Sequence, residues 1–282
     1  MIPAGFDYAP ASSADEAVAL LAQHGDDAKL LAGGHSLLPL MRLRLAQPAM
    51  LVDIGNLRDL AYVREAGDGT GEVVVGALTR HHEVATSDVL RRRAPLLAEA
   101  AGQVGDPQVR HRGTIGGSIA HGDPASDLPA ALLALRATLV ARGQGGERRI
   151  PVDEFFTGFL ETALGSDELL TEIRVPATDG APWAFQKFNR RAQDWAIVGV
   201  AAVMAANGDG GGPGVGLVHM GSVPLRAAGV EEALRQGAPA ADAAARAAEG
   251  TDPPGDINAS PEFRRHLAQV LVRRALEAAR PA

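Results

Sequence analysis

Two short segments, far apart in the chain, each place adjacent glycines next to small and hydroxyl-bearing residues. The first is the Ala-Gly-Gly-His-Ser stretch of residues 32–36, and the second is the Thr-Ile-Gly-Gly-Ser stretch of residues 114–118. Adjacent glycines let consecutive backbone N–H groups converge on one point, and a nearby hydroxyl group adds a donor. One such segment after a strand is more often only a turn. Two matched segments predict two anion-binding loops that meet around a pyrophosphate.

Neither segment fits the common nucleotide-binding turns. They lack the Gly-x-x-x-x-Gly-Lys-Ser/Thr loop and the Gly-x-Gly-x-x-Gly turn of doubly wound folds. The surrounding pattern also disfavours a doubly wound sheet, because short strands and helices alternate without regular long crossover helices. We therefore expect an α+β fold.

Local patterns predict many short elements before residue 176. Ser13 and Glu16 form the Ser-x-x-Glu pattern of a capping box, which predicts a helix ending near Gly25. Thr79 is expected to cap a helix through Val84. The other expected elements are strands 29–32, 51–54, 73–76 and 169–175, helices 96–104 and 126–135, and a hairpin of 137–142 with 147–152.

The polar, turn-rich stretch 176–182 is the expected domain boundary. It divides the chain into a first domain, 1–176, with subdomains of about 1–56 and 57–176, and a C-terminal domain, 177–282. Expected strands of the second domain are 185–188, 196–205 and 215–220, with 208–214 as a tight connection. Ser260 as cap and Pro261 at the first helical position predict a final helix.

Composition excludes several classes of function. The 27 basic and 34 acidic side chains give a net charge of −7, which disfavours nucleic-acid binding. The chain has no cysteine, so it cannot hold a disulfide, a thiolate zinc site or a cysteine-ligated iron–sulfur cluster. No leader pattern begins the sequence, and no apolar run reaches the ~20 residues of a membrane span. We expect a cytoplasmic protein without a transmembrane segment.

Residues 121–127 place His121, Asp123 and Asp127 directly after the second glycine segment. Asp127 could accept hydrogen bonds from ribose or ribityl hydroxyls, or it could cap the helix that follows. His121 is more often structural than a proton carrier. Trp195, which enters an apolar strand, could cover a planar ligand or be an ordinary edge tryptophan.

These motifs carry a resemblance to a known family. The stretches concerned are 32–54, 106–118 and 121–127, extended by 153–156, 167–173 and 187–195. Together they resemble the FAD-binding medium subunit of aerobic carbon monoxide dehydrogenase and the flavin domain of xanthine dehydrogenase, both molybdenum hydroxylases. The likeness covers almost the whole chain. Trp195 departs from it, since a Tyr beside the isoalloxazine ring is usual at that place.

The resemblance implies a two-subdomain FAD-binding domain of the vanillyl-alcohol-oxidase (PCMH) type, followed by a smaller C-terminal α+β domain. FAD would bind noncovalently between the subdomains, because the chain has no cysteine for one common tether. The residues implied at the cofactor are Ala32, Gly33, Gly34, His35, Ser36, Leu37, Thr114, Ile115, Gly116, Gly117, Ser118, Asp123, Asp127, Leu169, Leu170, Lys187 and Trp195. No catalytic residue and no metal ligand is implied on this chain.

The implied activity is electron transfer within an oxidoreductase. Electrons from a molybdenum cofactor on a large subunit would pass through [2Fe-2S] clusters of a small subunit to this FAD and then to an external acceptor. The complex would be a dimer of heterotrimers. Two alternatives are a self-sufficient flavin oxidase of a small organic substrate and a non-catalytic nucleotide-binding assembly protein.

Overall fold

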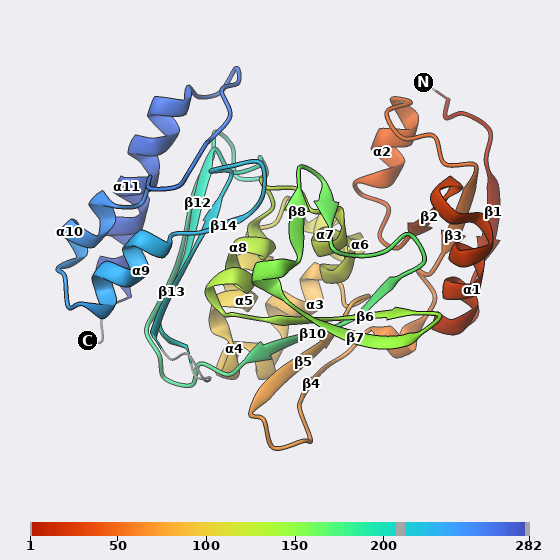
Figure 1. Cartoon of the computed structure of the whole chain (residues 1–282), viewed down its shortest axis with the longest axis horizontal. Coiled ribbons are helices and arrows are strands. Elements are labelled where there is room, and N and C mark those ends of the chain that lie inside the picture. Colours follow the sequence, from red (N-terminus) through yellow and green to blue (C-terminus); the bar gives the residue numbers. More distant parts are fainter. Residues whose placement is uncertain (1, 207–211, 280–282) are drawn as a thin grey trace.

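A small parallel sheet forms the N-terminal unit of the molecule (Figure 1). In the computed structural model, which describes residues 2–206 and 212–279, its strand order is β1-β3-β2. The strands are β1 (Asp7–Pro10), β2 (Ala28–Leu31) and β3 (Met50–Asp53). Met50 pairs with Asp7 on one side and with Ala28 on the other. The central strand β3 therefore fixes where β2 ends, which is where the first glycine segment begins.

Helix α1 (Ala14–His24) packs on this sheet and begins as predicted at Ser13. The Ser13 hydroxyl oxygen accepts from the backbone N–H of Glu16 at 3.1 Å. The Glu16 carboxylate, however, accepts from the N–H of Ser12 instead of Ser13, so the capping box is incomplete. The short elements that complete the unit are η1 (Gly25–Asp27), α2 (Leu37–Arg42) and η2 (Arg58–Leu60).

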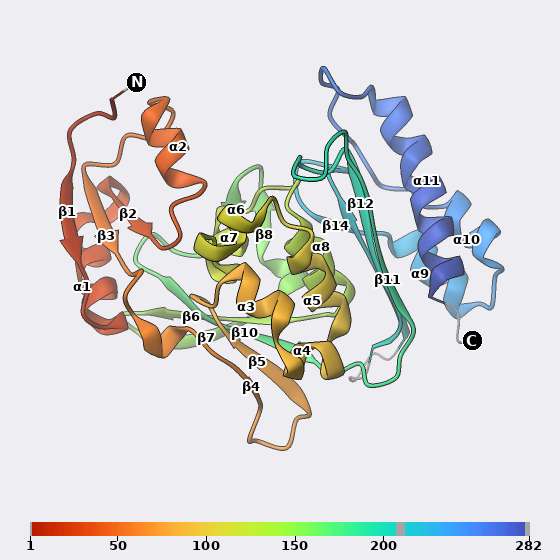
Figure 2. The ribbon, with the colours of Figure 1, turned by 180° about the vertical axis from the view of Figure 1, so that it is seen from behind.

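A five-stranded antiparallel sheet forms the middle of the molecule, with strand order β4-β5-β10-β6-β7. Its strands are β4 (Val63–Glu65), β5 (Glu72–Gly76), β6 (Thr138–Gly143), β7 (Gly146–Pro151) and β10 (Leu169–Pro176). The expected hairpin is present, since Gly143 pairs with Gly146. Helices cover one face of the sheet and share a buried apolar core with it (Figure 2). They are α3 (His81–Thr86), α4 (Asp88–Arg93), α5 (Pro95–Gly102), α6 (Pro107–Arg112), α7 (Ile115–His121) and α8 (Asp127–Ala134).

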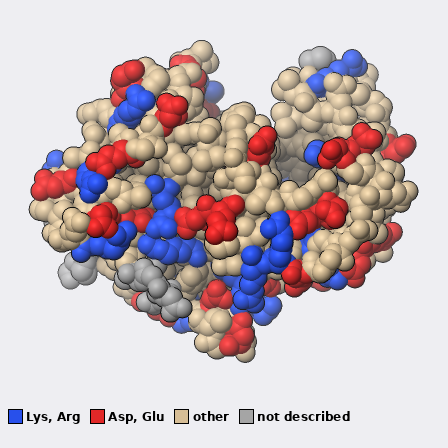
Figure 3. Space-filling view, in the orientation of Figure 1, with Lys and Arg blue, Asp and Glu red and all other residues tan. Residues whose placement is uncertain are grey.

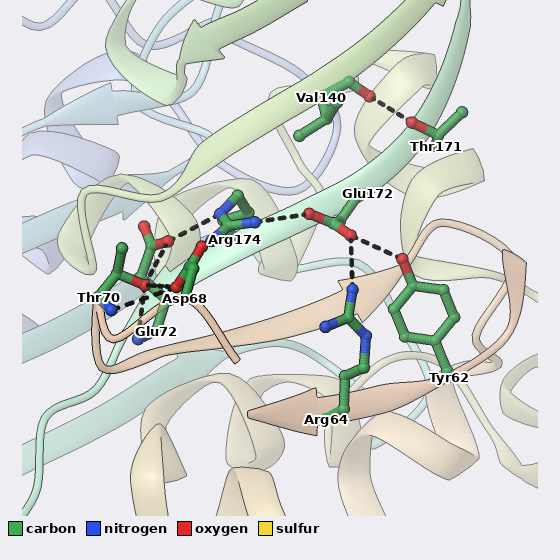
Figure 4. A network of polar contacts seen from close by, with 9 residues as sticks. All are labelled: Tyr62, Arg64, Asp68, Thr70, Glu72, Val140, Thr171, Glu172 and Arg174. Atoms are coloured by element: carbon green, nitrogen blue, oxygen red, sulfur yellow. Dashed lines mark hydrogen bonds and ion pairs between the residues drawn. The ribbon is translucent and has the colours of Figure 1, made fainter. Parts of the chain in front are cut away.

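A network of charges on β5 and β10 holds the β4–β5 hairpin against the sheet (Figure 4). Arg174 is buried, with 7% of its surface exposed, and its Nε lies 2.7 Å from the carboxylate of Glu72. Its two Nη atoms donate to Asp68, in the hairpin turn, and to Glu172. The Tyr62 hydroxyl donates to Glu172 at 2.7 Å, and burial raises the pKa of Tyr62 to about 12. Every nitrogen of this guanidinium therefore has a carboxylate partner.

The C-terminal unit is an antiparallel sheet with order β11-β12-β13-β14, covered on its outer face by three helices (Figure 1). The strands are β11 (Trp183–Phe188), β12 (Val198–Ala206), β13 (Gly212–Val218) and β14 (Leu225–Arg226), and the helices are α9 (Ala228–Arg235), α10 (Ala240–Ala245) and α11 (Pro261–Ala278). Its inner face packs on α8. A Cβ atom at Gly214 or Gly216 would lie 2.0 Å from a carbonyl oxygen of that helix, so only glycine permits this contact.

Three local predictions need correction or comment. Thr79 does not cap a helix, because its hydroxyl exchanges hydrogen bonds with the backbone of Tyr62, and α3 begins after Arg80. The second glycine segment is not a loop, as described below. Residues 208–211 of the expected connection lie outside the described residues, and residues 212–214 already belong to β13. The final helix begins at Ser260 as predicted.

Among the described residues, no helix combines the length and the apolar character needed to cross a bilayer. Acidic and basic side chains are interspersed on the face shown in Figure 3. This mixture on the visible face agrees with the sequence, which contains no extended basic run.

Candidate functional site

A cavity of about 760 Å³ lies between the N-terminal unit, helices α6 and α7, the start of β10 and the end of β11. Figure 3 shows a hollow between the N-terminal lobe, at the right, and the middle of the molecule. The small hairpin of β8 (Phe156–Gly158) and β9 (Glu161–Thr162) contributes to its wall. Its volume is within the range of roughly 300–1,000 Å³ typical of cofactor and ligand sites.

The first glycine segment is a loop between β2 and α2 that faces this cavity. Gly34 has a φ of +78°, a backbone conformation that glycine adopts at little cost. Within the described chain, the backbone N–H groups of residues 33–36 donate to no protein acceptor. Four neighbouring donors without partners form the concave anion site that the sequence predicts.

The second glycine segment is the beginning of a helix. Thr114 is the N-cap of α7, and Gly116, Gly117 and Ser118 lie in its first turn. The N–H groups of Ile115 and Gly116 donate to backbone carbonyls of residues 77–79 at 3.0 and 2.8 Å. The N–H of Gly117 donates to the Thr114 hydroxyl oxygen at 3.2 Å. The prediction of a second, matched loop is therefore wrong in its geometry, because the protein itself satisfies these donors.

The two glycine segments nevertheless lie against each other. A Cβ atom at Gly33 would lie 2.4 Å from the carbonyl oxygen of Arg112, just before α7. A Cβ at Gly117 would lie 3.8 Å from the Cβ of Ala32. Gly117 is exposed toward the cavity, whereas Gly116 is buried against Ala77. The close approach expected from the sequence is thus present, and glycine at position 33 is what permits it.

A buried ion pair forms another part of the wall. The Lys187 ammonium at the end of β11 lies 2.7 Å from a carboxylate oxygen of Asp127, with side-chain exposures of 4% and 7%. Lys187 also donates to the Gln103 carbonyl at 3.0 Å. Burial raises the pKa of Asp127 to about 6, against the opposing effect of Lys187. Ser126 is the N-cap of α8, so Asp127 does not act as the cap.

Two polar atoms, each buried on a residue that borders the cavity, have no hydrogen-bond partner within the described residues. They are Oδ1 of Asp127 and Nδ1 of His81. Orphaned polar atoms on residues around the same cavity as four free N–H donors fit a ligand that carries both anionic oxygens and hydroxyl groups. A dinucleotide such as FAD has both.

Sequence reasoning missed His81. Its ring lies beneath Gly113, where an added Cβ would be 2.7 Å from its Cδ2, and burial lowers its pKa to about 4. The charges of His35, Arg110 and Arg80 add to this lowering. Nothing in the sequence distinguishes His81 from the adjacent His82, so no local signal could have found it.

Most of the predicted cofactor residues border this one cavity. Those that do are Ala32, Gly33, Gly34, His35, Ser36, Leu37, Thr114, Gly116, Gly117, Ser118, Asp127, Leu169, Leu170, Lys187 and Trp195. Ile115 does not, because its side chain is fully buried in the core of the middle unit. Asp123 borders a second, smaller cavity next to the first. Their roles at a cofactor stay predictions.

Comparison with known proteins decides the family. Residues 4–178 match the family described as FAD binding domain in molybdopterin dehydrogenase, and residues 183–279 match the CO dehydrogenase flavoprotein C-terminal domain. The chain belongs to the FAD-binding subunits of molybdopterin dehydrogenases. The predicted family and fold class, an α+β chain with an FAD-binding domain and a C-terminal domain, are thereby confirmed.

Individual relatives are similar over their full length. The carbon monoxide dehydrogenase medium chain of Hydrogenophaga pseudoflava is 44% identical over 99% of this chain and 98% of the relative. The 6-hydroxypseudooxynicotine dehydrogenase complex subunit alpha of Paenarthrobacter nicotinovorans is 39% identical over 100% and 98%. A solved carbon monoxide dehydrogenase from Hydrogenophaga pseudoflava superposes with a TM-score of 0.94, covering 99% of this chain and 98% of that one.

Proposed function

We propose that this chain binds FAD noncovalently in the large cavity and serves as the electron-transfer subunit of a molybdenum hydroxylase. The observation that carries the proposal is the meeting of both glycine segments at one cavity, where the N–H donors of residues 33–36 have no acceptor among the described residues. The family and the full-length relatives support it.

The residues that border the cavity suggest how FAD is held. The free N–H groups of residues 33–36 would bind the pyrophosphate, with the Ser36 and Ser118 hydroxyls as further donors. Asp127 would accept a hydrogen bond from a sugar-like hydroxyl through its unpaired Oδ1. Leu169 and Leu170 would contribute apolar contact, and Trp195 would border the ring. We place the first domain at residues 1–176 and the second at 177–282.

Bound FAD supplies a centre that accepts and releases electrons, and the protein binds and orients it. The chain has no cysteine, and the described residues contain no cluster of three or more potential metal ligands. Electrons would therefore arrive from partners, a small subunit with [2Fe-2S] clusters and a large subunit with the molybdenum cofactor. Relatives of similar identity bear the names of different substrates, carbon monoxide and 6-hydroxypseudooxynicotine. We infer that the substrate is selected on another chain.

Absorption spectroscopy of the purified protein tests the cofactor. Flavin bands, and flavin released into the supernatant on acid precipitation, are expected. Yellow colour retained in the pellet would contradict noncovalent binding, and colourless protein would favour the assembly-protein alternative.

Coexpression with both partner chains, followed by size-exclusion chromatography, tests the subunit role. We expect a cytoplasmic complex with the size of a dimer of heterotrimers, in which substrate reduces the flavin. A chain that stays monomeric, with flavin unreduced in the presence of both partners, would overturn this role. Flavin reduced by a small organic substrate without partners would favour the oxidase alternative.

A further inference from the structure

Trp195 stands between two cavities. It borders the large cavity and also a smaller one of about 370 Å³ whose wall includes Asp123, His219 and Arg264. The Trp195 side chain is 58% exposed, so packing alone does not fix it. Its position therefore depends on the backbone that carries it.

The two residues that follow Trp195 are held through their carbonyl groups. Nδ1 of His219 lies 3.0 Å from the carbonyl oxygen of Ala196. Nη1 of Arg264 donates to the carbonyl oxygen of Ile197. The N–H of Ile197 donates to Phe188 at 2.8 Å, which closes the loop that carries Trp195. The indole therefore projects from a backbone that is anchored immediately behind it.

Arg264 is an unusual side chain for this place. It lies on α11, is 0% exposed and lines the smaller cavity together with His219 and Asp256. Its Nη2 lies 2.8 Å from the Asp256 carboxylate, and its Nε has no partner within the described residues. A buried charge costs free energy that a well-packed apolar residue would not, so core packing does not explain the arginine.

His219 also helps to hold the backbone that follows Trp195. It has a φ of +62°, a strained conformation for a residue other than glycine, and its N–H donates to the Pro124 carbonyl at 2.8 Å. Burial, and then the charge of Arg264, lowers the pKa of His219. Nδ1 of His219 also lies 3.0 Å from Nη1 of Arg264, so the imidazole and the guanidinium meet at the backbone of residues 196–197.

We propose that Arg264 is a positioning residue that fixes Trp195 as the wall of the FAD cavity. The planar guanidinium reaches the Ile197 carbonyl and the Asp256 carboxylate at once, and a flexible amine cannot span both. Helix α11 is thereby linked to the environment of the cofactor, although it does not border the large cavity. The inference rests on the proposed binding of FAD in that cavity.

The chain has two tryptophans, so Trp183→Phe leaves Trp195 as the sole indole reporter. In that background, Arg264→Met should lower the fluorescence anisotropy of Trp195 in the apoprotein and weaken its quenching by added FAD. The flavin content should stay close to that of the parent, because the glycine segments lie on other elements. Arg274→Met, at an exposed position of the same helix, is the matched control and should change neither signal.

Two further variants guard against a simple loss of folding. Asp256→Asn keeps Arg264 but removes its counter-charge, and should lower the anisotropy of Trp195 with the far-UV circular dichroism of the parent. Arg264→Lys should recover part of the signal lost in Arg264→Met. The proposal would be overturned if folded Arg264→Met showed the anisotropy and quenching of the parent. If Arg264→Met does not fold, the same result in Asp256→Asn would overturn it. The anisotropy of the apoprotein tests Arg264 even if FAD did not bind.

Discussion

The two glycine segments have nearly the same composition but different structural roles. In residues 33–36 the glycines leave consecutive N–H groups without acceptors in residues 2–206 and 212–279, so the loop can bind an anion. In residues 114–118 the fold satisfies the N–H groups of Ile115, Gly116 and Gly117, and the glycines mainly permit close packing. A Gly-Gly pair therefore predicts a close approach, but what approaches depends on whether the donors are already used.

Gly33→Asp should have the largest effect, a complete loss of flavin. A Cβ at this position would lie 2.4 Å from the Arg112 carbonyl oxygen, and a carboxylate would repel a phosphate at the free N–H groups. The ratio of flavin to protein in the purified variant measures the loss. Arg92→Ala, an exposed residue on α4, is the control and should keep its flavin. Bound flavin at the parental ratio in Gly33→Asp would refute the role given to this loop.

Lys187→Met should lower stability next most at a pH above the folded-state pKa of Asp127, because this carboxylate would then keep a buried charge without its partner. Removing one member of a buried pair costs about 3–5 kcal/mol. Lys29→Met, at an exposed position, is the control and should have little effect.

Lys187→Met should also change how the stability of the protein depends on pH. Burial raises the folded-state pKa of Asp127 from 3.8 to about 6, and Lys187 opposes the increase. Without Lys187 this pKa rises further, so the folded protein binds the proton more tightly than the unfolded chain. The variant should therefore lose stability as the pH rises through the folded-state pKa. Urea unfolding on both sides of pH 6 measures the deficit relative to the parent, and a deficit that shrinks at higher pH would contradict the buried pair.

Gly116→Ala should destabilise the protein without removing its cofactor. The added Cβ would lie 2.5 Å from the Cβ of Ala77, in a packed region where overpacking costs about 1–3 kcal/mol. Thermal unfolding and flavin titration separate the two effects. Gly102→Ala, whose Cβ would meet its nearest atom at 3.9 Å, should not be destabilised. Loss of FAD affinity in a fully folded Gly116→Ala would mean that the second segment binds as the first does.

Thr114→Val should have the smallest effect. It removes the hydroxyl oxygen that accepts from Gly117, and loss of an N-cap costs typically about 1 kcal/mol. The N–H of Gly117 would then be free, as those of residues 33–36 are. Unfolding in urea measures the cost, and an unchanged midpoint would show that this cap does not stabilise α7.

Much of the fold could be predicted from local signals. The cap at Ser13, the hairpin with Gly143 and Gly146 at its turn, and the start of α11 at Ser260 all follow from residues that interact with near neighbours in sequence. The start of α7 could not be recognised in this way. Glycine is a poor helix former, so two glycines in a first turn hide the helix, although Thr114 is a good cap.

The site could be predicted only in part. The glycine segments are visible in the sequence, and the resemblance to the family supplied Lys187 and Trp195. The pairing of Lys187 with Asp127, the orphaned His81 and the buried Arg264 depend on contacts between distant segments. No local pattern encodes such contacts, because each of these side chains is ordinary in its own stretch of sequence.

The contact between Gly33 and the Arg112 carbonyl has a consequence for how the chain folds. The two residues belong to different units, so closing this contact requires a long loop to order before it contributes stability. Closure of the cavity therefore depends on a non-local contact, and a chain in which this contact has not formed leaves the cavity open. A ligand that binds only the closed form draws the equilibrium toward it in proportion to its concentration. A protease that cuts only the open form should therefore cut the chain more slowly when flavin is present than when it is absent.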